Sequence, residues 1–430
     1  MPPMATRPMA VIADRLIDGT GRDPVDDAVV VWEGDQLTAV GARSTVRLPR
    51  ETEVIEAQDL TVLPGLMDLH VHLGMEAGVN FPRILMTPRA LTLLHAVPNS
   101  AATLQAGFTT VRDAGLTPAG VKLAVERGLF PGPRMAVAVS ILGQTGGHSD
   151  PFMPCGAALD LGSGLDVPAG VVDGIEAMRQ RVREVLRSGA DWIKLCTSGG
   201  VLSASDEPDA AQLTIEEIAT AVYEAQAQGK PCMAHAMSAK GIVNAVRAGV
   251  RTIEHGCFLD EEGIALMKER GATLVPTLVA PRDVIRNAEK DPASIPESMV
   301  KKSRDTMKRH AAAFRAAVEA GVDVAMGTDS GVGEHGGNGR EIALMVDHGM
   351  TPMQAILATT RTPARLLGLA SRLGTLEAGK LADLVAVRGN PLTEIALFND
   401  PEKMQIVVKA GVLVRPAAHP SLIPARSTTA

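Results

Sequence analysis

The stretch LPGLMDLHVHL, residues 63–73, resembles a buried β-strand that carries polar side chains near its end. His70 and His72 stand two positions apart in an otherwise apolar run. Because side chains alternate between the two faces of a strand, this spacing places both imidazoles on one face, where they can bind the same ion. A lone His-x-His pair is a weak signal, but two unpaired imidazoles inside an apolar strand would be costly.

Seven further apolar runs follow this one, and helical patterns lie between them. The eight candidate strands are 63–73, 108–115, 134–142, 191–197, 232–237, 251–257, 272–278 and 323–330. The helical patterns cover 174–188, 214–228, 239–248, 261–270 and 298–320, and the second begins with a capping box of Thr214 and Glu217. Alternating short strands and helices are typical of a parallel sheet, and eight such units predict a (β/α)8 TIM barrel.

The two ends of the chain differ from this central pattern. Residues 8–62, 381–391 and 404–416 contain β-branched runs punctuated by Gly and Asp, which indicate short strands and turns. The stretch from His419 onward has the composition of a tail. At 430 residues the chain has room for two or three domains, or for one barrel with appendages.

Composition and charge exclude several classes of function. The net charge is −7 and no basic block interrupts the chain, so nucleic acid is not an expected partner. The longest apolar runs, such as 135–142, are much shorter than the roughly 20 residues of a membrane span. The N-terminus lacks the apolar segment of a signal peptide, and the four cysteines show no Cys-x-x-Cys spacing. These features predict a cytoplasmic protein with reduced thiols.

Three long segments follow predicted strand ends, where the active sites of TIM barrels lie. They cover 143–171, 198–213 and 280–296, and we read all three as loops that bind or cover a substrate. The chain has 7 Phe, 2 Trp and 1 Tyr, so few aromatic residues can reach this region. Phe81, Phe152 and Phe258 are the candidates. A pocket for a bulky substrate would therefore be lined mainly by Leu, Val, Met and Gly.

Lys194 is the least expected residue of the strand patterns. In DWIKLCT, residues 191–197, it shares one face with Trp192 and Cys196, while the other face is aliphatic. Either face of a barrel strand is enclosed, and a buried lysine needs an anionic partner or a shifted pKa, both of which indicate function. The alternative is an aliphatic stem that extends its ammonium group to the barrel rim.

His235, His255 and Asp329 end three further strands in the contexts CMAHAM, TIEHG and GTDSG. Taken singly, each histidine could be a hydrogen-bonded core residue, and Asp329 could form a helix cap or an Asx-turn. Together with His70, His72 and Lys194 they occupy the carboxyl ends of strands one, four, five, six and eight. Those ends meet at one mouth of a barrel, so the six residues together predict a metal centre.

The motifs around these residues resemble those of the metal-dependent amidohydrolase superfamily. Within it, the chain is most similar to the binuclear branch of prolidase-like and ochratoxinase-like carboxypeptidases. The resemblance covers nearly the whole chain, and the motifs that carry it are PGLMDLHVHL, TTVRDAG, DWIKLCTSGGV, AHAMSAKGI, TIEHG, GTDSG and GTLEAGKLADLVAV, in this order.

The resemblance implies a binuclear centre and a role for each ligand. His70, His72 and Asp329 would hold the more buried ion, and His235 and His255 would hold the second. Lys194, carboxylated by CO2, would bridge the two ions as a carbamate. Imidazole and carboxylate ligands favour Zn²⁺. The ions would activate a bridging water, and Asp329 would carry its proton to the leaving nitrogen of an amide.

Other histidines and one arginine have weaker signals. His148, in the loop motif GQTGGHSD, resembles a family position near the substrate, where it could donate to the carbonyl or bind a carboxylate. The alternative is an exposed loop histidine. His335 and Arg340, just beyond Asp329, are weaker candidates for substrate binding. No role is predicted for the remaining histidines, which are His95, His310, His348 and His419.

The resemblance also implies a domain organisation and a substrate class. Residues 1–63 and 376–430 would form a composite β-sandwich domain beside a barrel of residues 64–375, and the protein would be a homo-oligomer. The expected reaction is hydrolysis of the amide bond of N-acyl amino acids or dipeptides. Xaa-Pro dipeptides and N-acyl aromatic amino acids such as ochratoxin A belong to this class.

Two alternatives to this reaction stay open. A cyclic-amide hydrolase of the imidazolonepropionase or hydantoinase kind would use a similar set of ligands. A non-catalytic metal-binding barrel is the other alternative, although it would need neither Lys194 nor Asp329. A deaminase is disfavoured, because mononuclear members of the superfamily generally lack the strand-four lysine and carry an HxxE acid. Here His235 is followed by AMSAKG instead.

Overall fold

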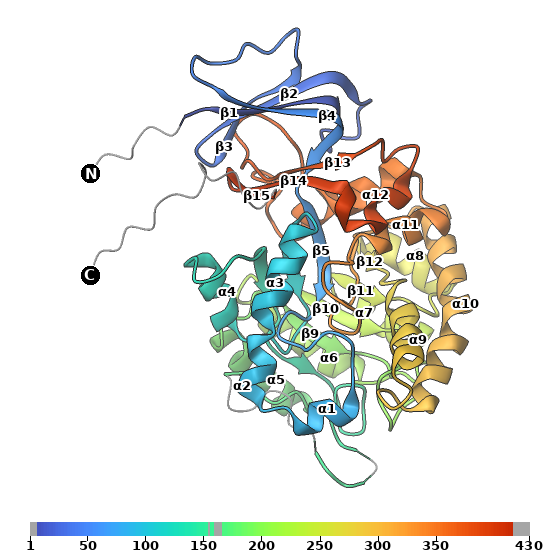
Figure 1. The fold of residues 1–430 in the computed structure, drawn as a ribbon. Coiled ribbons are helices and arrows are strands. Elements are labelled where there is room, and N and C mark those ends of the chain that lie inside the picture. The colour runs from blue at the N-terminus through green and yellow to red at the C-terminus, as the bar shows by residue number, and fades with distance from the viewer. Residues whose placement is uncertain (1–6, 154, 159–165, 416–430) are drawn as a thin grey trace, which may run out of the picture.

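The structure, a computed structural model, describes residues 7–153, 155–158 and 166–415, so the predicted tail from His419 lies outside the described residues. Figure 1 shows a sheet built from both ends of the chain, drawn in blue and red, above a barrel formed by the central residues. Within the described ranges every helix is too short or too polar to cross a bilayer.

The barrel consists of the predicted strands, all parallel to their neighbours. One three-stranded sheet and one five-stranded sheet form most of its wall. Their strands are β5 (Leu66–Val71), β6 (Phe108–Asp113) and β7 (Arg134–Val137), and β8 (Ile141–Leu142), β9 (Ile193–Cys196), β10 (Cys232–Ala236), β11 (Thr252–His255) and β12 (Thr273–Val275). The third predicted strand is thus divided into β7 and β8.

The eighth predicted strand, residues 323–330, is an extended segment that closes the barrel. The amide of Ala325 donates to the carbonyl of Leu274 at 2.9 Å, on the β12 side. The amide of Leu69 in β5 donates to the carbonyl of Met326 at 3.0 Å, on the other side. The predicted TIM barrel is therefore confirmed.

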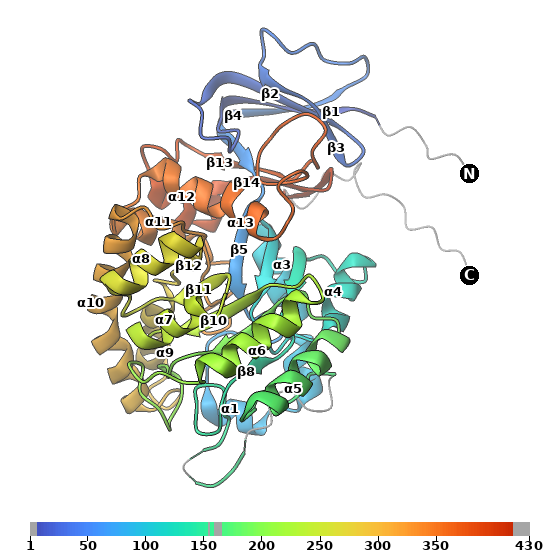
Figure 2. The same cartoon turned by 180° about the vertical axis from the view of Figure 1, so that it is seen from behind.

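Helices surround this barrel. They are α1 (Phe81–Met86), α2 (Arg89–Leu94), α3 (Ala96–Gln105), α4 (Ala119–Glu126), α5 (Ile175–Arg187), α6 (Ile215–Gln226), α7 (Ala239–Arg247), α8 (Glu261–Arg270), α9 (Ala280–Lys290), α10 (Glu297–Glu319), α11 (Arg340–Asp347), α12 (Pro352–Thr359) and α13 (Arg361–Leu366). Figure 2 shows α5 and α6 on the outer surface, where Arg179 of α5 pairs with Glu224 of α6. The predicted capping box of Thr214 and Glu217 begins α6.

One predicted loop contains a helix. The segment 280–296 was expected to be irregular, but its first eleven residues form α9. The reason is the apolar stripe that Ala280, Pro281 and Val284 bury, together with the preference of proline for the first turn of a helix. This helix forms part of the wall above the barrel mouth.

The terminal segments form one mixed sheet of seven strands in the order β15-β14-β13-β4-β1-β2-β3. These are β1 (Met9–Leu16), β2 (Val25–Glu33), β3 (Gln36–Ala42), β4 (Glu53–Pro64), β13 (Leu384–Arg388), β14 (Met404–Lys409) and β15 (Val412–Arg415). Trp32 of β2 packs in one cluster with Leu384 and Ile406, and its Nε1 donates to the carbonyl of Gly411 at 3.0 Å. Strands from the two ends of the chain therefore share one core, and β4 leads directly into the barrel.

Candidate metal centre and substrate cavity

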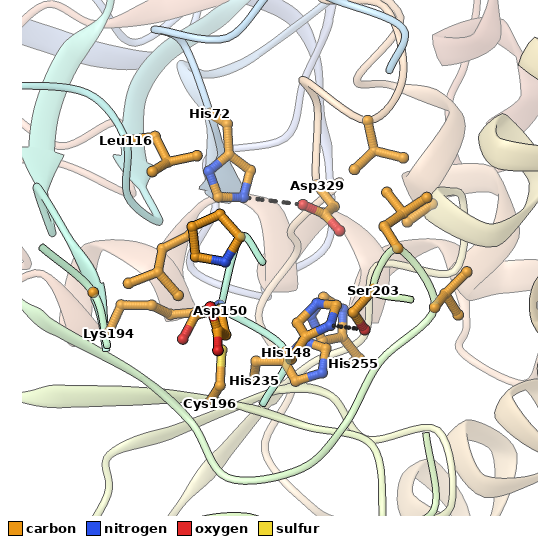
Figure 3. A pocket seen from close by; sticks show the side chains of 18 of the residues that line it. His72, Leu116, His148, Asp150, Lys194, Cys196, Ser203, His235, His255 and Asp329 are labelled. Atoms are coloured by element: carbon orange, nitrogen blue, oxygen red, sulfur yellow. Dashed lines mark hydrogen bonds and ion pairs between the residues drawn. The ribbon is translucent and has the colours of Figure 1, made fainter. Parts of the chain in front are cut away.

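The six residues predicted as metal ligands all line one cavity of about 410 Å³ at the carboxyl end of the barrel strands. The ring centroids of His70 and His72 lie 5.5 Å apart, those of His70 and His255 5.0 Å, and those of His235 and His255 4.6 Å. Figure 3 shows Lys194 and Asp329 beside these imidazoles. The structure therefore brings residues from five strands together at the bottom of this cavity. We call these six residues the floor.

Each of the four floor histidines has one ring nitrogen in contact with a protein oxygen. Nδ1 of His70 lies 2.8 Å from Oε2 of Glu254, and Nδ1 of His72 lies 3.0 Å from the carbonyl oxygen of Gly115. The same role is filled for His255 by Oγ1 of Thr277 at 2.7 Å from Nδ1, and for His235 by the carbonyl of Gly199 at 3.0 Å from Nε2. Such contacts fix the orientation of an imidazole and leave its second nitrogen for a metal ion.

Asp329 and Lys194 lie among these second nitrogens. Oδ1 of Asp329 lies 3.2 Å from Nε2 of His72 and 3.5 Å from Nε2 of His70, and Nζ of Lys194 lies 3.5 Å from the same nitrogen of His70. Ligand atoms of His70, His255 and Asp329 all lie within 4.8 Å of one another. This donor set of imidazole nitrogens and a carboxylate fits a divalent metal ion.

The backbone is strained at two of these residues. His255 has a φ of 71° and Asp329 a φ of 62°, the left-handed region that non-glycine residues rarely adopt. Such conformations persist where the surrounding structure over-determines them, and they cluster at functional sites. Both residues stand at the carboxyl ends of barrel strands, so the strain turns their side chains towards the mouth.

Burial and neighbouring charges set the protonation states of the floor. Burial lowers the pKa values of His235 and His255 well below the usual range of histidine. Positive charge on neighbouring groups, Lys194 among them, lowers both pKa values further. Burial alone would raise the pKa of Asp329, but His70 and His72 outweigh it and hold that pKa well below the usual range. The floor thus combines two neutral imidazoles with a carboxylate, as metal ligation requires.

Glu254 and Arg112 support the floor from inside the barrel, and sequence reasoning did not find them. Nη2 of Arg112 donates to both carboxylate oxygens of Glu254 at 2.8 and 2.9 Å, and its guanidinium lies 4.5 Å from the ring centroid of Trp192. Both charged groups are fully buried. Burial would raise the pKa of Glu254, but Arg112 and His70 lower it to about 2. The sequence does contain a signal for this pair, because Arg112 and Glu254 each place a charged residue inside an apolar strand pattern.

His148 reaches the cavity from the loop that follows β8. Its ring stacks on that of His235 with 4.1 Å between centroids, and its Nδ1 lies 2.9 Å from Oγ of Ser203. Ser203 in turn donates to Oδ1 of Asp206. A Cβ atom at Gly200 would lie 2.3 Å from Cε1 of His148, so this glycine leaves the space that the imidazole occupies. The histidine is held between two loops and is not an exposed loop residue.

His335 and Arg340 are placed elsewhere than predicted. Neither residue lines the cavity. The two guanidinium nitrogens of Arg340 donate to the two carboxylate oxygens of Asp283 at 2.7 and 2.8 Å, which joins α11 to α9. His335 is partly buried, and its Nδ1 lies 3.4 Å from Oγ1 of Thr103. Their contact with a substrate stays a prediction.

The walls above the floor are mostly aliphatic, as predicted from the scarcity of aromatic residues. They include residues of the described parts of the loops 143–171 and 198–213, of α9 and α10, and of other segments around the mouth, and they contain the phenylalanines Phe81 and Phe152. Phe258 does not line the cavity, because its ring lies 3.6 Å beneath the guanidinium of Arg309. The apolar side chains of the walls are those of Met75, Leu116, Ile141, Met153, Val167, Val171, Val201, Leu202, Met237, Val284, Met299 and Val332.

Comparisons with known proteins agree with this geometry. The model of the amidohydrolase family matches residues 61–414. The ochratoxinase of Aspergillus niger is 33% identical over 424 residues, which cover 94% of this chain and 86% of that protein. The crystal structure of a Xaa-Pro dipeptidase with bound methionine superimposes with a TM-score of 0.85 at 36% identity, and covers 94% of this chain and 99% of its own.

A third relative is a prolidase solved with N-methylphosphonate-L-proline. It superimposes with a TM-score of 0.87 at 33% identity, over 94% of this chain and 99% of its own. The sequence relative and the two structures each cover 94% of this chain, and the family model spans the barrel and the C-terminal strands of the sheet. The chain therefore belongs to the amidohydrolase family of metal-dependent hydrolases.

Proposed function

We propose that the chain is a binuclear metal-dependent amidohydrolase that cleaves the amide bond of N-acyl amino acids or dipeptides. Xaa-Pro dipeptides and N-acyl aromatic amino acids such as ochratoxin A are the substrates we expect first. One observation carries the proposal: four histidines, each with one ring nitrogen held by a protein oxygen outside the cluster, surround Asp329 and Lys194 beneath an apolar cavity. The relatives named above, an ochratoxinase, a Xaa-Pro dipeptidase and a prolidase, support this substrate class.

The ligands divide into two groups. In this proposal His70, His72 and Asp329 hold one ion, and His235 and His255 hold the other. The ammonium form of Lys194 would repel both cations, whereas a carbamate formed with CO2 would supply anionic oxygens that bridge them. Imidazole and carboxylate ligands suit Zn²⁺.

In the proposed reaction Asp329 transfers a proton and His148 contacts the substrate. When bound, the ions activate water at neutral pH and polarise the amide carbonyl. Asp329, whose Oδ1 faces the imidazoles of His70 and His72, accepts a proton from the attacking water and passes it to the leaving nitrogen. His148, held at Nδ1 by Ser203, has Nε2 left to donate to the substrate carbonyl or carboxylate when it is protonated. The aliphatic walls exclude bulk water around these transfers.

The test combines metal analysis with a substrate panel. We expect the purified protein to contain about two ions per chain and to hydrolyse N-acyl aromatic amino acids or Xaa-Pro dipeptides. Turnover of cyclic ureides alone would show a cyclic-amide hydrolase instead. Bound metal without turnover of any amide would show a non-catalytic metal-binding barrel.

Asp329→Asn tests the proton transfer within this scheme. We expect hydrolysis to fall at least ~100-fold, because a general acid–base group is lost. Asp323→Asn is the matched control, since Asp323 lies in the same segment with 44% of its side chain exposed. An Asp329→Asn enzyme that keeps its rate would remove the residue from this role.

The compartment and the assembly are part of the proposal. The described residues contain four free cysteines, and Cys196, Cys232 and Cys257 are buried, which supports a cytoplasmic protein with reduced thiols. We also propose a homo-oligomer. Light scattering of the purified chain tests the assembly, and a monomer at micromolar concentration would contradict it.

A further inference from the structure

Helix α10 changes character along its buried side. Towards its C-terminal end, Ala313 and Phe314 pack into the main hydrophobic core of the barrel. Nearer its start, the buried positions Ser303, Thr306 and His310 are polar, and all three line the cavity. The helix is therefore apolar where it packs into the core, whereas its cavity-lining residues are Met299 and these three polar side chains.

Two of these side chains have one polar atom without a hydrogen-bond partner. Oγ of Ser303 and Nε2 of His310 are buried without a hydrogen bond, and the two residues are 0% and 2% exposed. The His310 ring also meets the backbone carbonyls of His255 and Pro276. Thr306 differs, because its hydroxyl donates to the carbonyl of Lys302 at 2.7 Å. Buried polar groups in native proteins are nearly always hydrogen-bonded, so two unpartnered groups on one cavity wall point to a ligand that bonds them.

The surroundings of this wall disfavour a charged ligand group. Among the residues that line the cavity, Lys194 on the floor is the one lysine, and arginine is absent. Lys302 on the same helix donates to the carbonyl of Ser203 at 3.1 Å, and Arg309 covers the ring of Phe258. The loop residues outside the described ranges, 154 and 159–165, add no lysine or arginine by their sequence. An anionic group at α10 would therefore lie without a countercharge.

We propose that this face of α10 is a recognition subsite for an uncharged hydrogen-bonding group of the substrate. Ser303 and His310 stand seven residues apart, which is about 10 Å along a helix, so the subsite extends outward from the floor. A hydroxyl, carbonyl or carboxamide at the far end of an apolar substituent would reach it. Ile141, Val167 and Val171 supply apolar contacts from other parts of the same cavity. The inference rests on the proposed function and narrows its substrates to amides with a polar-tipped apolar substituent.

The test uses matched substrates. N-benzoyl amino acids that carry a hydroxyl at each ring position in turn are compared with the plain benzoyl compound and with carboxylated ones. We expect the best hydroxylated isomer to exceed the plain compound by about tenfold in kcat/KM, and the carboxylated compounds to be the poorest. Because the two side chains lie about 10 Å apart, one ring hydroxyl can bond only one of them. Either His310→Leu or Ser303→Ala should therefore reduce the preference for the best hydroxylated isomer to less than about threefold, and His310→Gln should keep part of it where His310 is the partner.

Controls separate recognition from folding. Lys308→Leu changes an exposed position of the same helix and should leave the preference intact. A preference that persists in both Ser303→Ala and His310→Leu would overturn the proposal, and so would an equal loss on all substrates, which indicates a structural role. If the wild type hydrolyses none of these compounds and no Xaa-Pro dipeptide either, the proposed function fails. Calorimetric binding of the same set to the wild type and the variants then decides whether α10 selects the hydroxyl.

Discussion

The floor and the α10 wall of the cavity differ in whether their buried polar groups have hydrogen-bond partners in the protein. On the floor, His70 contacts Glu254 and His255 contacts Thr277, so each ring is held before any ligand arrives. On the wall, Oγ of Ser303 and Nε2 of His310 are buried without a hydrogen-bond partner. The floor is organised for ions that must be held in a fixed geometry, whereas the wall retains unused hydrogen-bonding capacity.

Lys194→Ala should have the largest effect on the floor. We expect the protein to lose its metal and at least ~100-fold of its activity, because the bridging ligand is lost. Added formate or acetate should restore part of both, since a small carboxylate can occupy the vacated space. Metal analysis and initial rates check this, with the exposed Lys268→Ala as the control. Unchanged metal content would contradict the bridging assignment.

Glu254→Gln should weaken the floor from beneath. The change leaves Arg112 as a buried cation without its countercharge and removes the carboxylate that holds His70. We expect a loss of about 3 kcal/mol in the free energy of unfolding and a ~10–100-fold weaker metal affinity. Denaturant unfolding and metal titration measure the two effects.

Glu262→Gln is the matched control for this change. Glu262 pairs with Arg247 on the surface, where the two side chains are 61% and 52% exposed, so less than about 1 kcal/mol should be lost. Equal effects of Glu254→Gln and Glu262→Gln would mean that the buried pair does not support the site.

Ser203→Ala should have a smaller effect, confined to the rate. Ser203 positions His148, and loss of one hydrogen bond is worth about tenfold in kcat. KM and metal content should change little, and Ser203→Thr should recover part of the rate. Ser205→Ala, which removes an exposed hydroxyl in the same loop, should have no effect. A loss of metal in Ser203→Ala would show that the residue serves the floor instead of His148.

Ser303→Ala should have the smallest effect, and it should leave the free energy of unfolding unchanged or raise it slightly. Its hydroxyl has no partner, and alanine is the better helix former, so we expect unfolding to cost the same or up to about 1 kcal/mol more. Thermal and denaturant unfolding of the substrate-free protein measure this difference. A loss of stability above about 1 kcal/mol would show that Ser303 has a partner in the protein and would remove the contrast with the floor.

The floor residues could be located from the sequence because each proposed metal ligand interrupts an apolar strand. His70, His72, Lys194, His235 and His255 are all visible in this way, and parallel strands bring their carboxyl ends together. Glu254 and Arg112 interrupt strands in the same manner. They were missed because the motifs were searched for metal ligands and not for the buried charges that hold them.

The walls could not be predicted to the same degree, because they depend on contacts between distant segments. Arg340 was placed at the rim, but its partner Asp283 lies 57 residues earlier on α9, in a segment read as a loop. His310 was given no role because it lies on an amphipathic helical pattern. Such a pattern shows which side of a helix is buried, but not whether that side faces a core or a cavity.

Stepwise metal reconstitution tests the central claim most directly. A chelator strips the protein, Zn²⁺ is added back, and the hydrolysis of an N-acyl aromatic amino acid or an Xaa-Pro dipeptide is followed against metal per chain. We expect the rate to rise to a plateau at about two ions per chain. A plateau at one ion, or a rate that does not depend on metal, would contradict a binuclear floor that hydrolyses amides.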